Sequence, residues 1–168
     1  MGNKTVDYIL KKDCCGCGVC QEICPFNAIR MEGGELGNIY PKIDDKLCKK
    51  CSLCYAFCSN RKQYNDSEPE NAFVSACVDK TVRLMSASGG FFSALAKIVI
   101  ENGGVAYGAN LAFIGGEPIV RHIRIDSCDR IKLISGSLYV ESNIHDALCS
   151  ILADLNDGKK VLFCGTSC

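Results

Sequence analysis

After about residue 80, apolar and polar positions follow the periods of helices and strands in turn. Apolar residues recur at helical spacing over 91–102, and the glycine pair that follows, at 103–104, predicts the end of that helix. A second helix is expected between Asn143, as its N-cap, and Gly158. Other apolar runs predict strands at 105–113, 118–125 and 159–164, and a short helix at 126–134. Helices that alternate with strands predict an α/β layer.

The chain changes character after its first third. Residues 1–62 are rich in cysteine and turn residues, whereas 63–80 is a polar stretch that predicts a linker. Residues 81–168 then form the region of helices and strands. The sequence stops directly after the last predicted strand, where an α/β sheet normally runs on into a loop and a helix. We therefore expect a C-terminally truncated chain, with 81–168 as the first part of a domain.

Cysteine is the unusual component of the composition. It accounts for 14 of the 168 residues, and nine of these lie between Cys14 and Cys58. Hydrophobic residues make up 48% and charged residues 23%, which excludes a wholly disordered chain. No stretch reaches the roughly 18 apolar residues of a membrane span, and the first residues do not form a signal peptide. We expect a cytoplasmic protein, whose reduced thiols bind metal instead of forming disulfides.

Charges balance over the whole chain, with 19 basic and 19 acidic side chains. Residues 1–62 carry 10 basic and 7 acidic side chains, and residues 63–168 carry 9 and 12. Neither part is basic enough to form a nucleic-acid-binding surface, so no nucleic acid is expected as a partner.

Two groups of four cysteines share one spacing, with intervals of two, two and three residues. They are Cys14, Cys17, Cys20 and Cys24 in the first motif, and Cys48, Cys51, Cys54 and Cys58 in the second. This spacing is typical of bacterial ferredoxins with two 4Fe–4S clusters. Three thiolates at intervals of two residues reach three irons from one tight loop, and Gly16 and Gly18 allow the first loop to close.

The fourth cysteine of each motif is expected to bind the cluster of the other motif, because the turn after the third cysteine carries it away. The first cluster would then be held by Cys14, Cys17, Cys20 and Cys58, and the second by Cys48, Cys51, Cys54 and Cys24. Such crossed ligation stabilises a segment whose apolar core is small. Lys49 and Lys50 lie between ligands, where they either steer an acidic redox partner or are simply solvated.

Zinc is the alternative metal, because paired cysteine motifs also build four-cysteine zinc sites. Zinc takes only four ligands, however, and would leave the third and fourth cysteines of each motif without a role. Two features depart from a regular pair of motifs. Cys15 is an extra thiol beside Cys14, and Ser59 follows the second motif where Pro25 follows the first.

The segment 8–60, with the run CPFNAI at 24–29, resembles a bacterial-type two-cluster ferredoxin domain. We therefore expect an α+β ferredoxin-like iron–sulfur domain over 1–62, followed after the linker by a partial α/β domain over 81–168.

Four later stretches carry a second resemblance, at 86–109, 120–125, 135–142 and 158–168. Together with the cysteine motifs, they resemble the β-subunit family of coenzyme F420-reducing hydrogenases and dehydrogenases. The resemblance covers roughly residues 10–168. It implies a flavin-binding α/β domain, with electrons passing between the clusters and FAD, and hydride exchange with the deazaflavin or another small-molecule acceptor.

The loop before the helix at 91–102 is the candidate flavin site. Its residues are Ser86, Ser88, Gly89 and Gly90. A Ser/Gly loop that opens a helix presents N–H groups and the positive end of the helix dipole to an anion, such as a flavin phosphate. Taken alone, such a loop is more often a helix cap. The sequence departs from the family at Ser135 and Leu138, where the family has arginine and lysine.

Five later thiols and both histidines lie outside these motifs. Cys77, Cys128 and Cys149 are isolated and are expected to be small buried apolar residues. Cys164 and Cys168 form a Cys-x3-Cys pair, for which a redox pair or an extra ligand is the alternative; packing is favoured for Cys164, and the role of Cys168 is open. Neither His122 nor His145 is expected to be catalytic, and no other catalytic residue is assigned.

Three functions follow from these features. The favoured one is an iron–sulfur flavoprotein module that relays electrons between 4Fe–4S clusters and a flavin, and serves a redox partner protein; it would be an oxidoreductase if the domain is complete. The second is a non-enzymatic ferredoxin-type electron-transfer protein with a cofactor-free appendage. The third is a zinc-stabilised interaction module.

Overall fold

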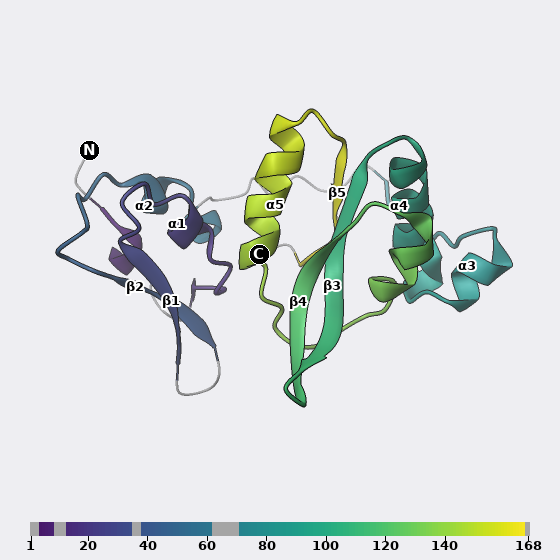
Figure 1. Cartoon of the computed structure of the whole chain (residues 1–168), viewed down its shortest axis with the longest axis horizontal. Coiled ribbons are helices and arrows are strands. Elements are labelled where there is room, and N and C mark those ends of the chain that lie inside the picture. The colour runs from purple at the N-terminus through teal and green to yellow at the C-terminus, as the bar shows by residue number, and fades with distance from the viewer. Residues whose placement is uncertain (1–3, 9–12, 35–37, 62–70, 167–168) are drawn as a thin grey trace. The chain divides into compact units, whose positions relative to one another are not determined.

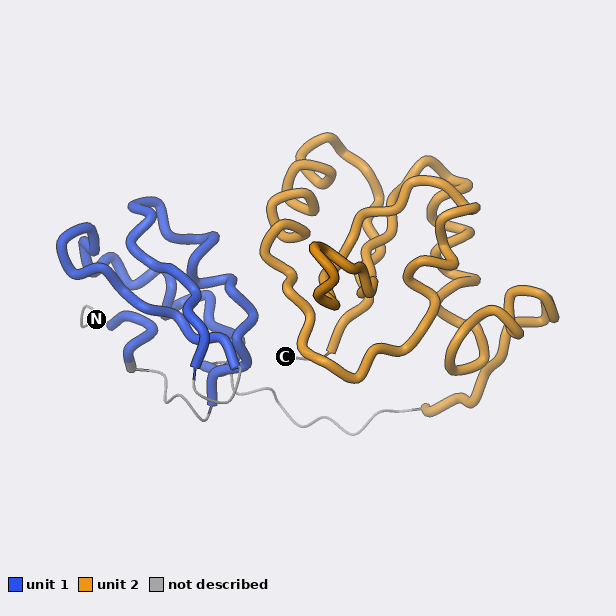
Figure 2. The backbone as a smooth tube through the Cα atoms, turned by 60° about the horizontal axis from the view of Figure 1, so that its bottom comes forward, with its two compact units in different colours: residues 1–67, 168 blue, residues 68–167 orange. Residues whose placement is uncertain are grey.

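The structure is a computed structural model that describes residues 4–8, 13–34, 38–61 and 71–166. The chain divides into two compact units (Figures 1 and 2). Unit 1 takes in residues 1–67 together with Cys168, which lies outside the described residues, and unit 2 takes in residues 68–167. The predicted linker over 63–80 falls partly outside the described residues, and its described part, up to Asp79, contains no helix or strand.

Unit 1 consists of short elements around a two-stranded sheet. Its described helices and strands are a 3-10 helix at Val6–Tyr8, α1 at Val19–Glu22, β1 at Ile29–Gly33, β2 at Ile39–Ile43, α2 at Leu53–Ala56 and a 3-10 helix at Ser59–Arg61. Strands β1 and β2 pair antiparallel, with Ile29 opposite Ile43. The buried core of the unit is small: Val6, Ile29 and Cys54 form it, with four further residues packed against them. Cysteine side chains therefore contribute to the interior of this unit.

Unit 2 has a three-stranded mixed sheet between helices. Its described elements are α3 at Lys80–Leu84, a 3-10 helix at Ser88–Gly90, α4 at Phe91–Glu101, β3 at Val105–Ile114, β4 at Glu117–Ile125, a 3-10 helix at Cys128–Leu133, α5 at His145–Asn156 and β5 at Val161–Phe163. The strand order is β4-β3-β5, in which β4 is antiparallel and β5 parallel to β3. Figure 1 shows α4 and α5 on opposite faces of this sheet.

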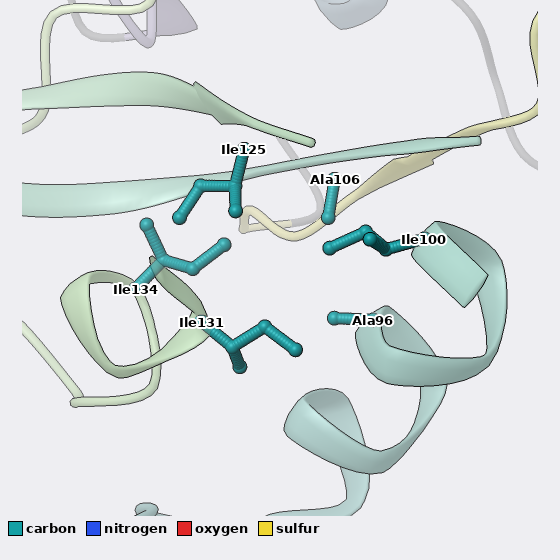
Figure 3. Close-up of a cluster of buried hydrophobic side chains, with 6 residues drawn as sticks. All are labelled: Ala96, Ile100, Ala106, Ile125, Ile131 and Ile134. Carbon is teal, nitrogen blue, oxygen red and sulfur yellow. The ribbon is translucent and has the colours of Figure 1, made fainter. Parts of the chain in front are cut away.

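Alternation along β3 gives the sheet two buried faces. Ala106 packs with Ala96 and Ile100 of α4 in a cluster that β4 and the 3-10 helix complete (Figure 3). The neighbouring residues Val105 and Tyr107 lie in a second cluster, against α5. Because successive side chains of a strand point to opposite faces, one strand supplies both cores. Three buried isoleucines complete the first core: Ile125 from β4, Ile131 from the 3-10 helix at Cys128–Leu133, and Ile134 directly after that helix.

The predicted elements of unit 2 are confirmed closely, with one correction at a helix start. We expected Asn143 to be the N-cap of the second helix, but α5 begins at His145 and Ile144 occupies the cap position. Asn143 still satisfies the helix start, because its Oδ1 accepts a hydrogen bond from the His145 N–H at 2.9 Å. The side chain therefore performs the capping from one residue farther out. Among the described residues, no helix is long and apolar enough to cross a membrane.

Candidate metal centres

The two cysteine motifs have the same local backbone structure. In the first, the Cys24 N–H donates to the Gln21 carbonyl, and 34 residues later the Cys58 N–H donates to the Tyr55 carbonyl. Three more hydrogen bonds recur at this offset, including those that start α1 and α2. The two motifs thus share backbone hydrogen bonds as well as cysteine spacing. Their third and fourth cysteines therefore occupy equivalent positions in the backbone.

Left-handed backbone conformations flank the second cysteine of each motif. Gly16 and Gly18 have φ of 68° and 75° in the first motif. The equivalent positions of the second motif are Lys50, with φ of 52°, and Ser52, with φ of 66°. A residue with a side chain pays roughly 1–2 kcal/mol for this conformation, so it persists only where the surrounding structure requires it. The second loop keeps the shape of the first in spite of that cost.

The first cavity brings together cysteines from both motifs. It has a volume of about 150 Å³, and its walls also include Val6, Met31, Tyr40 and Pro41. The four cysteines that we predicted to hold the first cluster all line it: Cys14, Cys17, Cys20 and Cys58. Cys15 lines it as well. Its thiols are the donor type that an iron–sulfur cluster requires, and they include the four donors that one cluster needs.

The second cavity contains the complementary set of thiols. Its lining includes the four cysteines that we predicted for the second cluster: Cys24, Cys48, Cys51 and Cys54. Its volume is only about 10 Å³, the space that one water needs, so the donors fit a cluster and the present volume does not. Cys51 is exposed, as are Lys49 and Lys50, so this loop lies at the surface of unit 1.

The thiols do not converge on one ion. Among the described residues, no three His, Cys, Asp or Glu side chains form a group that could hold a single metal ion. None of the described cysteines forms a disulfide. The sulfurs line two cavities, each with a set of four or more.

Burial and backbone N–H groups shift the pKa of the thiols in opposite directions. Burial raises the pKa of Cys20 to about 12, and it raises the pKa of Cys17 to about 11 with a further contribution from Cys15. Backbone N–H groups partly offset this rise, those of Val19 at Cys17 and Gln21 at Cys20. Other N–H groups reach sulfur too: that of Ala28 lies 3.4 Å from Cys24 Sγ. Such hydrogen bonds stabilise negative charge on a ligand sulfur and so set the potential of a bound cluster.

Only part of the predicted flavin loop faces a cavity. A cavity of about 270 Å³ lies within unit 2, among α3, α4 and the 3-10 helix at Cys128–Leu133. Ser86 lines it, together with Ser93, Lys97, Lys132 and other residues. Ser88, Gly89 and Gly90 are not in its lining. Ser86 Oγ donates to Ser93 Oγ at 2.7 Å, which places two hydroxyl groups side by side in the wall.

Gly89 and Gly90 have a packing role in this structure. A Cβ on Gly89 would lie 3.1 Å from the Ser75 carbonyl oxygen, and one on Gly90 would lie 3.2 Å from the Arg83 Cα. The Gly89 carbonyl accepts a hydrogen bond from the Cys77 N–H at 2.7 Å. Both glycines also have left-handed φ, at 75° and 76°. The chain itself therefore occupies the space beside the two glycines.

The two departures from the family pattern also have positions in the structure. Ser135 is buried, lines the cavity of unit 2, and donates from Oγ to the Met85 carbonyl at 3.1 Å. An arginine at this position would lose that buried hydrogen bond, and its side chain would enter only if the surrounding residues rearranged. Leu138 is half-buried and is not in the lining of the cavity.

The isolated thiols are less buried than we predicted. Cys128, Cys149 and Cys164 are exposed and Cys77 is intermediate, so the expectation that they are buried packing residues is wrong. For Cys149 the reason is helical phase. Helix α5 turns Ala147 toward the sheet, and a residue two positions away lies on the far side.

Sequence reasoning missed the partners of His122. The ring is buried and stacks on Phe163 at 4.9 Å between centroids. Its Nε2 lies 2.9 Å from the Cys164 carbonyl oxygen, which only accepts, so Nε2 carries the proton and Nδ1 accepts from Ser142 Oγ at 2.8 Å. His122 thus links β4 to the end of β5 and to the 135–142 stretch. Period-two alternation in β4 could have indicated its burial, but not these partners.

Comparison with known proteins identifies the first motif. Residues 8–30 match the family model of the 4Fe-4S binding domain, and no curated protein matches the chain. The matched segment contains α1 and the first cysteine motif. The cysteines of this motif line the two cavities described above. The first motif therefore belongs to a 4Fe-4S binding domain, which implies at least one 4Fe–4S cluster and supports a role in iron–sulfur electron transfer.

Proposed function

We propose that unit 1 binds two 4Fe–4S clusters with crossed ligation and that the protein relays single electrons through them. The first cluster is assigned to Cys14, Cys17, Cys20 and Cys58, and the second to Cys24, Cys48, Cys51 and Cys54. The observation that carries this proposal is the lining of the two cavities, because each contains three cysteines of one motif and the fourth of the other. The repeated hydrogen bonds support a second site equivalent to the first.

The residues of unit 1 have separate tasks in this function. A bound 4Fe–4S cluster takes up and releases one electron at a time. The thiolates fix its position, and the N–H groups of Val19, Gln21 and Ala28 stabilise the added negative charge. Val6 and Met31 limit the access of water to the first site. Binding of the second cluster requires the exposed loop at Cys51 to open, because the second cavity is too small for a cluster in this structure.

Metal analysis tests the number of clusters. Anaerobically purified protein should contain about eight iron and about eight sulfide per chain, four of each per cluster. Cys17→Ser and Cys51→Ser should each halve the iron content, and Cys128→Ser, which changes an exposed thiol of unit 2, should leave it unchanged. About four iron in the wild type, unaffected by Cys51→Ser, would reduce the proposal to one cluster. Colourless protein that contains zinc would replace it with the zinc-stabilised interaction module.

The second site is the expected docking point for a redox partner protein. Lys49 and Lys50 are exposed and directly precede the exposed Cys51 in the chain, so positive charge lies beside this predicted ligand. An acidic partner would be steered to this loop, and the association rate would fall as salt is added. A Lys49→Gln/Lys50→Gln variant should slow electron transfer to an acidic acceptor protein several-fold at low ionic strength. The same variant should transfer electrons to a neutral small-molecule acceptor at the wild-type rate. Free thiols at this density suit a reducing compartment, and we place the protein in the cytoplasm.

A second candidate function adds a flavin in unit 2. The cavity of unit 2 supports it. Its lining includes the hydroxyl groups of Ser86 and Ser93 and the exposed lysines Lys97 and Lys132, which are donors for a phosphate group, and also the Asp129 carboxylate. We propose that this cavity binds the phosphate end of FAD. The cluster electrons would then reach a two-electron cofactor able to exchange hydride with a deazaflavin such as coenzyme F420, or with another small molecule.

Flavin content separates this oxidoreductase from the non-enzymatic carrier. Protein incubated with FAD and freed of excess should release flavin on denaturation, and Lys97→Ala/Lys132→Ala should lower the amount retained at least tenfold. Lys80→Ala, at an exposed position outside the cavity, is the matched control. Wild-type protein that retains no FAD, while its iron content is full, would establish the carrier with a cofactor-free appendage.

A further inference from the structure

The first cavity has one thiol more than a 4Fe–4S cluster needs. Five cysteines line it, and all five are partly buried: Cys14, Cys15, Cys17, Cys20 and Cys58. The second cavity has four, because the residue after Cys48 is Lys49, where the first motif has Cys15 after Cys14. Comparison of the two motifs therefore identifies Cys15 as the additional thiol.

Local geometry explains how two adjacent residues reach the same cavity. Adjacent side chains of an extended strand point to opposite sides. Residues 14–18 contain no helix or strand, and Gly16 follows Cys15 with a left-handed φ of 68°. The segment is therefore not an extended strand, and Cys14 and Cys15 both line the first cavity. The Cys15 thiol also interacts with that of Cys17, a predicted ligand.

We propose that Cys15 is an alternative ligand of the first cluster, which can take the iron that Cys14 holds. This inference rests on the proposed function, since it requires a cluster in the first cavity. The exchange is a ligand substitution without electron transfer. The Cys15 thiol loses its proton and forms an iron–sulfur bond, while the bond to Cys14 breaks and the Cys14 thiolate takes up a proton. The cluster keeps its charge and four protein ligands throughout.

Alternative ligation would protect the first site against loss of one ligand. Oxidation or alkylation of Cys14 removes a thiolate and would normally expose an iron to solvent. With Cys15 at the same wall, the cluster retains four thiolates. The second site, with no thiol at the position of Lys49, lacks this protection. The structure thus predicts that the first site tolerates loss of its first cysteine and that the second site does not.

Alanine variants at equivalent positions test the proposal. Cys14→Ala and Cys48→Ala remove the first cysteine of each motif, and iron and sulfide are measured in anaerobic preparations. We expect Cys14→Ala to retain about eight iron per chain, Cys48→Ala to retain about four, and Cys14→Ala/Cys15→Ala to retain about four. Cys15→Ala alone should retain about eight. The iron that remains in the double variant would show that unit 1 still folds around the other cluster.

Alkylation of the native protein gives a readout independent of iron content. Mass spectrometry should find label on Cys15 but not Cys14 in the wild type, and Cys15 should become protected in Cys14→Ala. Loss of half the iron in Cys14→Ala, as in Cys48→Ala, would overturn the inference and leave the two-cluster proposal standing. Loss of half the iron in Cys15→Ala would also overturn it, because Cys15 would then be the regular ligand. Wild-type protein without iron would refute the proposed function itself.

Discussion

At the residue scale, Asp154 shows how unit 2 keeps a charge in its interior. The residue is 4% exposed, and its carboxylate accepts hydrogen bonds from Arg124 Nε at 2.7 Å, Lys159 Nζ at 2.8 Å and Tyr107 Oη at 2.5 Å. These donors, Arg124 foremost, hold the pKa of Asp154 well below its usual range, although burial alone would raise it. Because partners on β3, on β4 and after α5 meet at one carboxylate, the charge links the sheet to its covering helix.

Asp154→Asn should destabilise unit 2 and change its dependence on pH. A folded-state pKa below the unfolded value of about 3.9 gives stability that is present above that pH and is lost as the pH falls through the folded value. At pH 7, the variant should lose about 3 kcal/mol of unfolding free energy, the low end for a broken buried ion pair, since Arg124 keeps Asp126 as a partner. The difference from the wild type should shrink below about pH 4.

Urea denaturation followed by far-ultraviolet circular dichroism measures this effect. The signal reports mainly unit 2, because α4 and α5 have 11 and 12 residues and the described α-helices of unit 1 have four each. Asp157→Asn is the matched control, since its carboxylate is 68% exposed and lies 3.7 Å from Lys159. Equal losses in the two variants, or a difference that does not depend on pH, would contradict the role assigned to Asp154.

At the element scale, some features followed from the sequence and others did not. The period of apolar residues located α4, β3, β4 and β5, because each pattern matches burial on one or both faces. Cysteine spacing indicated a tight loop of three thiols in each motif, because chain geometry within a motif is local. The assignment of the fourth cysteine to the cluster of the other motif joins distant segments and stays a prediction. The hydrogen bonds of Asp154 and His122 were not predicted, since they join residues that are distant in sequence. The left-handed conformations of Lys50 and Ser52 were also missed, because neither residue type favours them.

The loop of the second motif should become more stable when glycine replaces its strained residues. Ser52→Gly relieves the left-handed strain at φ of 66°, partly offset by the greater flexibility of the unfolded chain, for a net gain of up to about 1 kcal/mol. Gly18→Ala should have the opposite effect at the equivalent position, where a Cβ would meet only Met31 Cγ, at 3.9 Å. The temperature at which the visible absorbance of the clusters is lost should rise in the first variant and fall in the second.

A glycine elsewhere in unit 1 provides the control for this pair of variants. A Cβ added to Gly33, at the end of β1, would meet no atom within 4 Å, and this glycine has no left-handed φ. Gly33→Ala should therefore leave the temperature of absorbance loss nearly unchanged. If Gly18→Ala and Gly33→Ala behaved alike, the shared loop conformation would not be a requirement of the two motifs.

At the scale of the whole molecule, the two units differ in what holds them together. Unit 2 has two apolar clusters, one on each face of its sheet. Unit 1 has one cluster with three buried residues, of which one is the predicted ligand Cys54 and two of the packed neighbours are Cys20 and Cys24. A core that includes the ligands themselves is completed by metal binding. Folding of unit 1 is therefore expected to be coupled to its clusters, as in other small metal-binding domains.

Removal of iron should therefore unfold unit 1 and leave unit 2 folded. A chelator and an oxidant applied to the full chain should abolish the visible absorbance and the protection of backbone amides from hydrogen exchange in β1 and β2. Amides of β3, β4 and α5 should keep their protection, because their buried clusters contain no predicted ligand. Hydrogen exchange with mass spectrometry resolves the two sets of segments. Loss of protection in β3 and α5 to the extent seen in β1 would show that the clusters stabilise the whole chain, and persistence of protection in β1 would show that unit 1 folds without metal.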